Sequence, residues 1–239
     1  MRRGAAARLS AALALIGLLW GQAAAAEQAM DPDNPSCPRD LNWSTYRQMH
    51  FALDTSSGHR ILRAEGVIDE GAPDRLKAAL DASKPIDEIW IRSPGGDARA
   101  GNAAGKIVRD AMIPTRIPRS WACFSACNFL FMGGVARFVD DGGLFIVHMF
   151  THTSDREALR AEVSGGDDKA AATVGSIEQD SAMLASEDND FLIRMGVSRK
   201  LLTDVMYKQK AVAEQGGDRS TRRCLTQEET IRYNVANAR

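Results

Sequence analysis

The chain has 239 residues, of which 44% are hydrophobic and 26% are charged, as is ordinary for a globular protein of one or two domains. Its 30 Lys and Arg side chains are balanced by 31 Asp and Glu side chains, which gives a formal net charge of -1. This balance argues against a nucleic-acid-binding protein, which carries a basic excess. The apolar content and the low net charge argue against a disordered acidic chain.

The first 26 residues have the pattern of a secretory signal peptide. An apolar run at 11–20 follows three basic side chains, Arg2, Arg3 and Arg8. Ala24 and Ala26 then supply the small residues of an A-x-A cleavage site. The apolar run is about half as long as a membrane span, so we predict a cleaved signal peptide over 1–26 rather than an uncleaved membrane anchor. We therefore expect an exported protein, periplasmic or secreted, with no stable membrane span after cleavage.

The mature chain is expected to begin with a polar, proline-containing lead-in over residues 27–48. An alternating pattern at 49–53 and a second β-like run at 61–68 predict a pair of strands separated by a turn. Pro73 suits the first turn of a helix. The run IDEIWI at 86–91 is rich in β-branched residues and predicts the next strand.

Strand and helix patterns continue to alternate along the middle of the chain. A helix is predicted after residue 96. The patterns that follow are those of a strand, a short apolar helix and two further strands, at 115–117, 125–132, 137–139 and 144–150. This alternation predicts an α/β core with parallel strand pairing.

The region from about 155–210 has helical character. A stripe at alternating steps of three and four contains five apolar residues among seven: Val174, Ile177, Ser181, Leu184, Asp188, Phe191 and Met195. This stripe predicts a long helix whose apolar face packs within the chain or contacts a second copy of it, and both interpretations stay open. Thr226 and Glu229 form a capping-box pattern that predicts a final short helix.

Four cysteines enter the oxidising environment that export implies, where disulfides persist. They are Cys37, Cys123, Cys127 and Cys224. Four cysteines allow three pairings, and the sequence does not choose among them. A zinc site is the rival interpretation, but no C-x-x-C pair is present. We expect no metal and no cofactor.

A Ser-Pro-Gly-Gly turn at 93–96 lies between a predicted strand and a predicted helix. Such a turn leaves backbone N–H groups without partners and without side chains in the way, so it can stabilise a developing oxyanion. A plain strand-to-helix turn is the structural alternative.

Two further residues suit nucleophilic catalysis. Ser125 lies between Cys123 and Cys127 at the start of the short apolar helix, where the helix dipole favours an alkoxide, and helix capping is the structural alternative. His148 ends an apolar strand, and core packing is its structural alternative. A metal site shared with His152 would need both rings on one helix face, so it is not favoured.

Five segments in a fixed order extend these motifs. They are AEGVID, IWIRSPGGDARAGNAAGKIV, CFSACNFLFMGG, GLFIVHMF and CLTQEETIRYNV. With them, the chain from about 61 to 235 resembles the ClpP/crotonase superfamily, and most closely its exported ClpP-like members. The resemblance implies an α/β fold of repeated β-β-α units with a long C-terminal helical extension. It also implies a single domain over 49–239, with a handle-like helical region at about 155–210.

The resemblance implies a role for each motif. Ser125 corresponds to the nucleophile and His148 to the general base, which a serine hydroxyl needs near neutral pH. The N–H groups of Gly95, Gly96 and Ala126 correspond to the oxyanion hole. The cysteines on either side of Ser125 depart from ClpP itself, and a disulfide between them would stiffen the nucleophile turn.

The sequence also differs from the family pattern at the third catalytic residue, because Arg222 stands where the resemblance implies an aspartate. Asp218 is the nearest carboxylate and the first candidate to orient His148. More distant or neutral candidates are Asp190, Asp204, Ser220 and Thr221.

The sequence therefore predicts an exported serine hydrolase, most plausibly a peptidase that acts on peptides or unfolded proteins by acyl transfer and that forms a homo-oligomer. The alternative is a non-catalytic binding or assembly protein on the same scaffold. An acyl-CoA enzyme of the crotonase type is disfavoured by the export signal. A serine–lysine dyad with Lys169 is a mechanistic variant. No nucleic-acid partner is expected.

Overall fold

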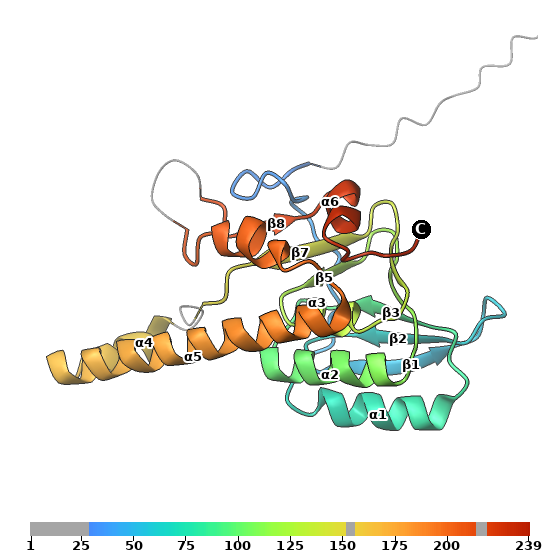
Figure 1. Cartoon of the computed structure of the whole chain (residues 1–239), viewed down its shortest axis with the longest axis horizontal. Helices are drawn as coiled ribbons and strands as arrows, with labels where there is room; N and C mark the ends of the chain where they lie inside the picture. The colour runs from blue at the N-terminus through green and yellow to red at the C-terminus, as the bar shows by residue number, and fades with distance from the viewer. Residues whose placement is uncertain (1–28, 152–155, 214–218) are drawn as a thin grey trace, which may run out of the picture.

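The larger of two sheets has five strands: β1 (His50–Asp54), β2 (Ile61–Glu65), β3 (Glu88–Arg92), β4 (Thr115–Ile117) and β6 (Arg137–Val139). They lie in the order β1-β2-β3-β4-β6, with β1 antiparallel to β2 and the other neighbours parallel. Figure 1 shows this arrangement in a computed structural model that describes residues 29–151, 156–213 and 219–239. The predicted α/β class and the parallel pairing are confirmed.

The smaller sheet contains the strand that ends next to Ser125 and the strand that ends at His148. It consists of β5 (Ala122–Phe124), β7 (Leu144–His148) and β8 (Arg222–Cys224), in the order β5-β7-β8. β5 and β7 are parallel, and β8 is antiparallel to β7. Two strands that run side by side in the same direction end at the same sheet edge, so the residues that follow β5 and end β7 become neighbours.

Three helices pack in a layer against the larger sheet: α1 (Ala72–Ser83), α2 (Ala98–Asp110) and α3 (Cys127–Met132). Two glycines of α2 allow it to approach α3 closely. A Cβ on Gly101 would lie 2.4 Å from the Ala126 carbonyl oxygen, and one on Gly105 would lie 2.3 Å from that of Phe129. Because no side chain fits there, the start of α2 is held directly beside the turn that contains Ser125.

One continuous hydrophobic core joins the larger sheet to the helical layer. Its largest fully buried aromatic side chains are Phe131, Phe145 and Phe191. A second, smaller cluster covers the other side of the small sheet and contains Cys37, Ala122, Ile146 and Cys224.

The long helix predicted from the stripe is α5 (Asp167–Met195), preceded by α4 (Arg156–Val163). Its C-terminal half packs on the core through Phe191, Leu192 and Met195, and it ends at Gly196 in the left-handed conformation. Its N-terminal half projects from the body beside α4 (Figure 1). Intramolecular packing therefore accounts for the C-terminal part of the stripe.

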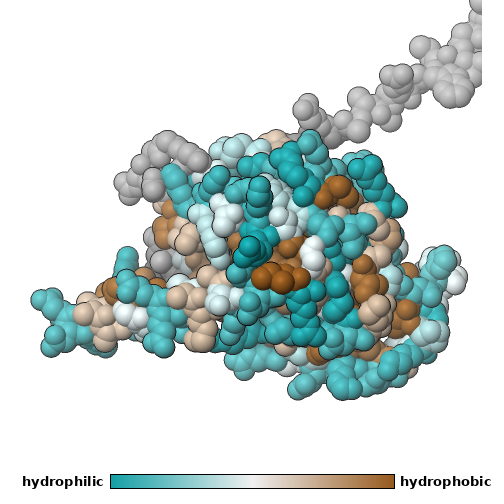
Figure 2. Space-filling view, in the orientation of Figure 1, coloured by the Kyte–Doolittle hydropathy of each residue, from teal (hydrophilic) through white to brown (hydrophobic). Residues whose placement is uncertain are grey.

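The projecting arm formed by α4 and the first half of α5 carries apolar side chains among polar ones (Figure 2). Its exposed apolar side chains include Val163 and Val174. Among the described residues, no helix is both long and apolar enough to span a membrane.

The four cysteines form two disulfides, Cys37–Cys224 and Cys123–Cys127. The first ties the lead-in to β8. Asn34 reinforces this attachment, because its side-chain oxygen accepts hydrogen bonds from the backbone N–H groups of Thr221 and Arg222. With every cysteine in a disulfide, the zinc interpretation is wrong. The predicted signal peptide over 1–26 lies outside the described residues.

The chain after α5 returns to the core in short elements. A π-helical turn η1 (Leu201–Val205) and a 3-10 turn η2 (Met206–Lys208) lead toward β8. The final helix α6 (Gln227–Arg232) begins with the predicted capping box, in which Thr226 and Glu229 exchange hydrogen bonds.

Candidate active site

Ser125 occupies a sharp turn between β5 and α3. Its φ is +59°, a left-handed conformation that costs a non-glycine residue about 1–2 kcal/mol. The Cys123–Cys127 disulfide closes around the turn on both sides of the serine. Ser125 does not cap the helix, because Ala126 is the N-cap of α3 and no side chain caps that helix. The hydroxyl of Ser125 is therefore available to another partner.

That partner is His148, the last residue of β7. Phe124 and Ile146 are opposite one another in the β5–β7 register, which places Ser125 and His148 at the same sheet edge. The Ser125 Oγ lies 2.7 Å from the His148 Nε2. This distance is that of a nucleophile–base hydrogen bond. The structure thus brings together two residues that are 23 positions apart in the sequence.

The surroundings of His148 favour the neutral imidazole. Burial lowers the pKa of His148 from its usual value, and a hydrogen bond with the backbone of Met149 acts in the opposite direction. The ring also packs against Phe124, with 4.6 Å between the ring centroids. A neutral imidazole at pH 7 can accept the proton of the serine hydroxyl.

Two backbone amides beside Ser125 are suited to hold an oxyanion. In the described part of the chain, no hydrogen bond uses the N–H of Gly96 or that of Ala126, and both residues line the cavity at Ser125. Gly95 differs, because its N–H donates to Ser93 Oγ at 3.0 Å. Of the three residues assigned from the resemblance, the structure therefore favours Gly96 and Ala126 over Gly95 as donors.

Gly95 instead has a packing role in this turn. Its φ is +90°, and a Cβ at this position would lie 2.5 Å from the Phe124 carbonyl oxygen and 2.7 Å from Ser125 Cβ. Only glycine lets the two turns approach this closely. Gly95 thereby sets the distance between the Gly96 amide and the serine.

In the described part of the chain, no carboxylate bonds to His148. Asp218, the first candidate for this role, lies outside the described residues, as does His152. Arg222 pairs with His148 across β7 and β8, but its guanidinium donates to Asp31 Oδ2 at 2.7 Å. Asp31 thus holds the positive charge of Arg222 away from the histidine.

The more distant and neutral candidates for orienting His148 make different contacts. Asp190 is exposed and lines a different cavity, and the Asp204 carboxylate accepts a hydrogen bond from Thr203. The backbone N–H of Thr221 donates to Asn34, and the Ser220 carbonyl accepts the N–H of Lys210. Lys169 is exposed near the start of α5 and donates to the Ala161 carbonyl, so the geometry does not favour a serine–lysine dyad.

Ser125 and His148 open into a cavity of about 440 Å³. Apolar side chains from several elements form much of its wall: Ala98, Phe129, Phe150, Leu184 and Met206. Two carboxylates of α5, Asp180 and Asp188, also line it, and the sequence prediction gave neither of them a role. The sequence did contain an indication of a role for Asp188, because this carboxylate interrupts a stripe that is otherwise largely apolar.

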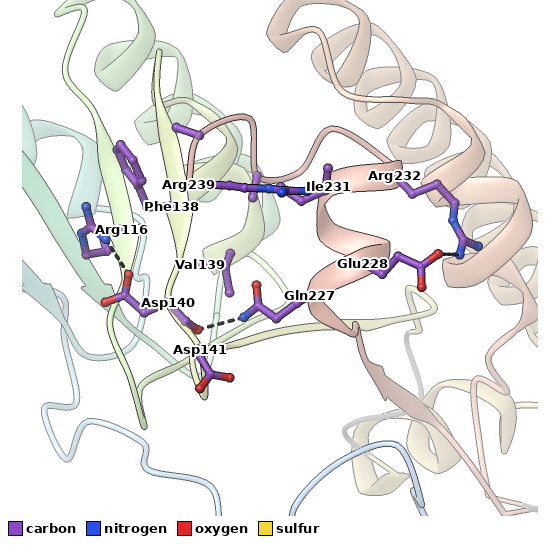
Figure 3. Close-up of a pocket in the computed structure, with 12 residues that line it drawn as sticks. Arg116, Phe138, Val139, Asp140, Asp141, Gln227, Glu228, Ile231, Arg232 and Arg239 are labelled. Carbon is purple, nitrogen blue, oxygen red and sulfur yellow. Dashed lines mark hydrogen bonds and ion pairs between the residues drawn. The ribbon is translucent and has the colours of Figure 1, made fainter.

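A second cavity, of about 610 Å³, lies between β6 and α6 and is drawn in Figure 3. Four of its charged side chains form two ion pairs, since Arg116 bonds to Asp140 and Arg232 bonds to Glu228. No serine, cysteine or histidine lines it. The pairing of a serine hydroxyl with a histidine is therefore a feature of the Ser125 cavity and not of this one. Among the described residues, no group of His, Cys, Asp and Glu side chains is arranged to hold a metal ion.

The disulfide around Ser125 leads to a prediction about rate. Replacing Cys123 and Cys127 together with alanine should lower the rate at which a serine-directed covalent probe labels Ser125 by about 10- to 100-fold, because a freed turn no longer fixes the hydroxyl. The matched control replaces Cys37 and Cys224 with alanine, which removes the second disulfide and should lower stability with little change in rate. An unchanged labelling rate in the Cys123/Cys127 variant would show that the turn is rigid without its disulfide.

Comparison with known proteins gives a structural similarity and no sequence match. No family model and no curated protein matches the chain. Among solved structures, the chain is similar to a mutant of ClpP1 from Listeria monocytogenes, with a TM-score of 0.47 and 15% sequence identity. The aligned region covers 74% of this chain and 89% of that one. The chemistry of the site rests on the geometry described above, because a fold does not fix a function.

Proposed function

We propose that the protein is a serine hydrolase that cleaves peptide bonds by acyl transfer. The observation that carries the proposal is the 2.7 Å contact between Ser125 Oγ and His148 Nε2. It lies beside the N–H groups of Gly96 and Ala126, which have no partner in the described chain. A nucleophile, a neutral base and two oxyanion donors in one cavity are the parts that acyl transfer needs.

The reaction proceeds in two halves. Ser125 Oγ attacks the carbonyl carbon while His148 Nε2 takes the hydroxyl proton, and the amides of Gly96 and Ala126 hold the oxyanion. The C–N bond then breaks, and the leaving amine takes the proton from the imidazolium. Water attacks the resulting ester with His148 as base, the ester C–O bond breaks, and the proton returns to Ser125 Oγ as the acid departs.

Covalent labelling tests the proposal. A fluorophosphonate probe should label the wild-type chain at Ser125, and labelling should disappear in Ser125→Ala. Mass spectrometry of the labelled peptide identifies the modified residue. Labelling that persists in Ser125→Ala would remove Ser125 as the nucleophile. Absence of labelling in the wild type, under both oxidising and reducing conditions, would refute the hydrolase.

The second candidate function is a non-catalytic binding or assembly protein. The observation that favours it is that no carboxylate orients His148 within the described residues. Such a protein would bind peptides or unfolded segments in the Ser125 cavity without cleaving them. Peptide binding by the wild type with no labelling and no hydrolysis would establish this second function.

The pH dependence of labelling follows from the environment of His148. The base must be neutral, and burial lowers the pKa of His148. The labelling rate should therefore stay level from about pH 8 down to pH 7 and should fall only as the pH passes below the usual histidine value of about 6.5. Rates measured across this range give the midpoint. A midpoint above the usual histidine value would contradict the assignment of His148 as the base.

Export to the periplasm or the medium is part of the proposal. It is supported by the signal pattern over 1–26 and by two disulfides, which persist in oxidising compartments. A reporter enzyme fused after residues 1–30 should be secreted, and its retention inside the cell would refute export.

Self-association through the projecting arm of α4 and α5 is also proposed. It is supported by the exposed apolar side chains on that arm, which include Val163 and Val174. A mass measurement at micromolar concentration should give an oligomer, and a monomer would refute the assembly.

A further inference from the structure

Asp188 occupies an unusual position for a carboxylate. It lies on α5 and lines the same cavity as Ser125 and His148. In the described part of the chain, no hydrogen bond or ion pair joins the Asp188 carboxylate to another residue, and only burial and the charge of Glu187 act on its pKa. A partly buried carboxylate without a partner is costly when it is ionised, so in the wall of a reactive cavity it binds either a proton or a ligand of opposite charge.

The charges around Asp188 do not supply that partner. Glu187 on the same helix is negative, and it joins burial in raising the pKa of Asp188 to about 7. Tyr207, on η2, has its own pKa raised by burial and by the charge of Asp188. Asp97, the N-cap of α2, and Arg99, in the first turn of that helix, also line the cavity.

Arg99 is the basic residue among those that line the cavity, and it is exposed. Water therefore screens its charge. Asp97 is already engaged, since its carboxylate accepts the Ala100 N–H at the start of α2. The histidine of the pair is neutral for the reasons given above. The cavity is thus short of positive charge at Asp188.

The rest of the wall defines the shape of a suitable ligand. Asp180, Leu184 and Asp188 recur at intervals of four residues and share one face of α5, so a carboxylate follows an apolar side chain along the wall. Phe129 and Met206 supply further apolar surface. A lysine or arginine side chain has the matching form, an apolar stem with a cationic end.

We infer that Asp188 is a specificity-determining residue that binds the cationic end of a lysine or arginine side chain next to the reacting carbonyl of the substrate. This inference rests on the proposed hydrolase function and names the substrate class of that site: peptides cleaved after a basic residue. Asp180, two turns away on the same face of α5, is a second carboxylate that adds to the negative potential of this wall.

Matched substrates test the inference. Two fluorogenic peptides would differ only in the residue before the cleaved bond, lysine in one and the uncharged, similarly long norleucine in the other. At about pH 8, above the pKa of Asp188, the wild type should cleave the lysine peptide with a kcat/KM about 10-fold or more above that of the norleucine peptide. Asp188→Asn should remove this preference, because kcat/KM should fall much further for the lysine peptide than for the norleucine peptide.

Asp190→Asn is the matched control, because Asp190 is a carboxylate of the same helix that lines a different cavity. It should leave the lysine preference intact. A lysine preference that is absent in the wild type, or unchanged in Asp188→Asn, would overturn the inference. An equal loss for both peptides in Asp188→Asn would also overturn it, since Asp188 would then act on the catalytic pair and not on the substrate side chain.

Failure of the inference and failure of the hydrolase give different results. If a neutral fluorophosphonate labels Ser125 while the lysine preference is absent, the hydrolase stands and the assignment of Asp188 falls. If no probe labels Ser125 and neither peptide is cleaved, the proposed function falls and the substrate class falls with it.

Discussion

Replacing His148 with alanine is expected to lower kcat/KM for peptide hydrolysis at pH 7 by about 10⁴-fold. The reason is geometric, since Nε2 of His148 lies 2.7 Å from Ser125 Oγ. In the described chain, no other base forms a hydrogen bond with that hydroxyl. The amides of Gly96 and Ala126 would remain, so some activity above the uncatalysed rate should survive. Steady-state kinetics and the fluorophosphonate labelling rate should fall together.

The matched control is His59→Ala, which removes an exposed histidine that approaches only the half-exposed Asp87. Its kinetics should equal those of the wild type. If His148→Ala keeps more than about a tenth of the wild-type rate, His148 is not the base. Lys169 would then be the residue to replace, despite its position outside the cavity.

Replacing Arg137 with methionine is expected to lower the free energy of unfolding by about 2–3 kcal/mol. Arg137 is the first residue of β6 and is 1% exposed. Its guanidinium donates to four backbone carbonyls, those of Gly134, Met195, Asn234 and Val235. Arg109 also donates to the carbonyls of Gly134 and Met195, so the substitution deprives those of Asn234 and Val235 of the guanidinium donor. Val235 is fully buried, and leaving its carbonyl without that donor is the costly half of losing a hydrogen bond.

No carboxylate pairs with Arg137 in the described chain, and burial together with the nearby charge of Arg109 lowers the pKa of Arg137 to about 10. The guanidinium is therefore held by carbonyl oxygens from the end of α5 and from the C-terminal segment. Denaturant unfolding measures the effect, with Arg119→Met as control. Arg119 forms an exposed ion pair with Asp141, so its replacement should change stability by less than about 0.5 kcal/mol. A similar small change for Arg137→Met would show that water or a local rearrangement satisfies the carbonyls.

Local patterns were sufficient to predict most of the elements. The alternation at 49–53, the run at 86–91 and the stripe from Val174 to Met195 each correspond to a strand or helix of the structure. The proximity of Ser125 and His148 was predicted through the resemblance, and the parallel pairing of β5 with β7 supplies its physical reason. Strand periodicity could not assign these strands to a separate sheet, because pairing partners depend on contacts between distant segments.

Other parts of the site depend on tertiary contacts that no local pattern carries. The position of Asp188 in the cavity wall follows from where α5 crosses the body, whereas the stripe only indicated which face of the helix is buried. The N–H of Gly95 is engaged by Ser93 Oγ, a detail of the turn that its glycine content does not reveal. Arg137 was not singled out either, because an arginine is usually exposed and only its four carbonyl partners explain its burial.

The Cys37–Cys224 bond has a topological consequence. It joins residues 187 positions apart, and every strand of the two sheets lies within this span, so both sheets are enclosed in one covalent ring. A protease that cuts one exposed loop inside this ring, such as the turn between β1 and β2, leaves both pieces joined. The nicked molecule keeps the electrophoretic mobility of a single chain until a reductant opens the bond. Comparing digests with and without reductant therefore distinguishes cuts inside the ring from cuts at the C-terminal segment outside it.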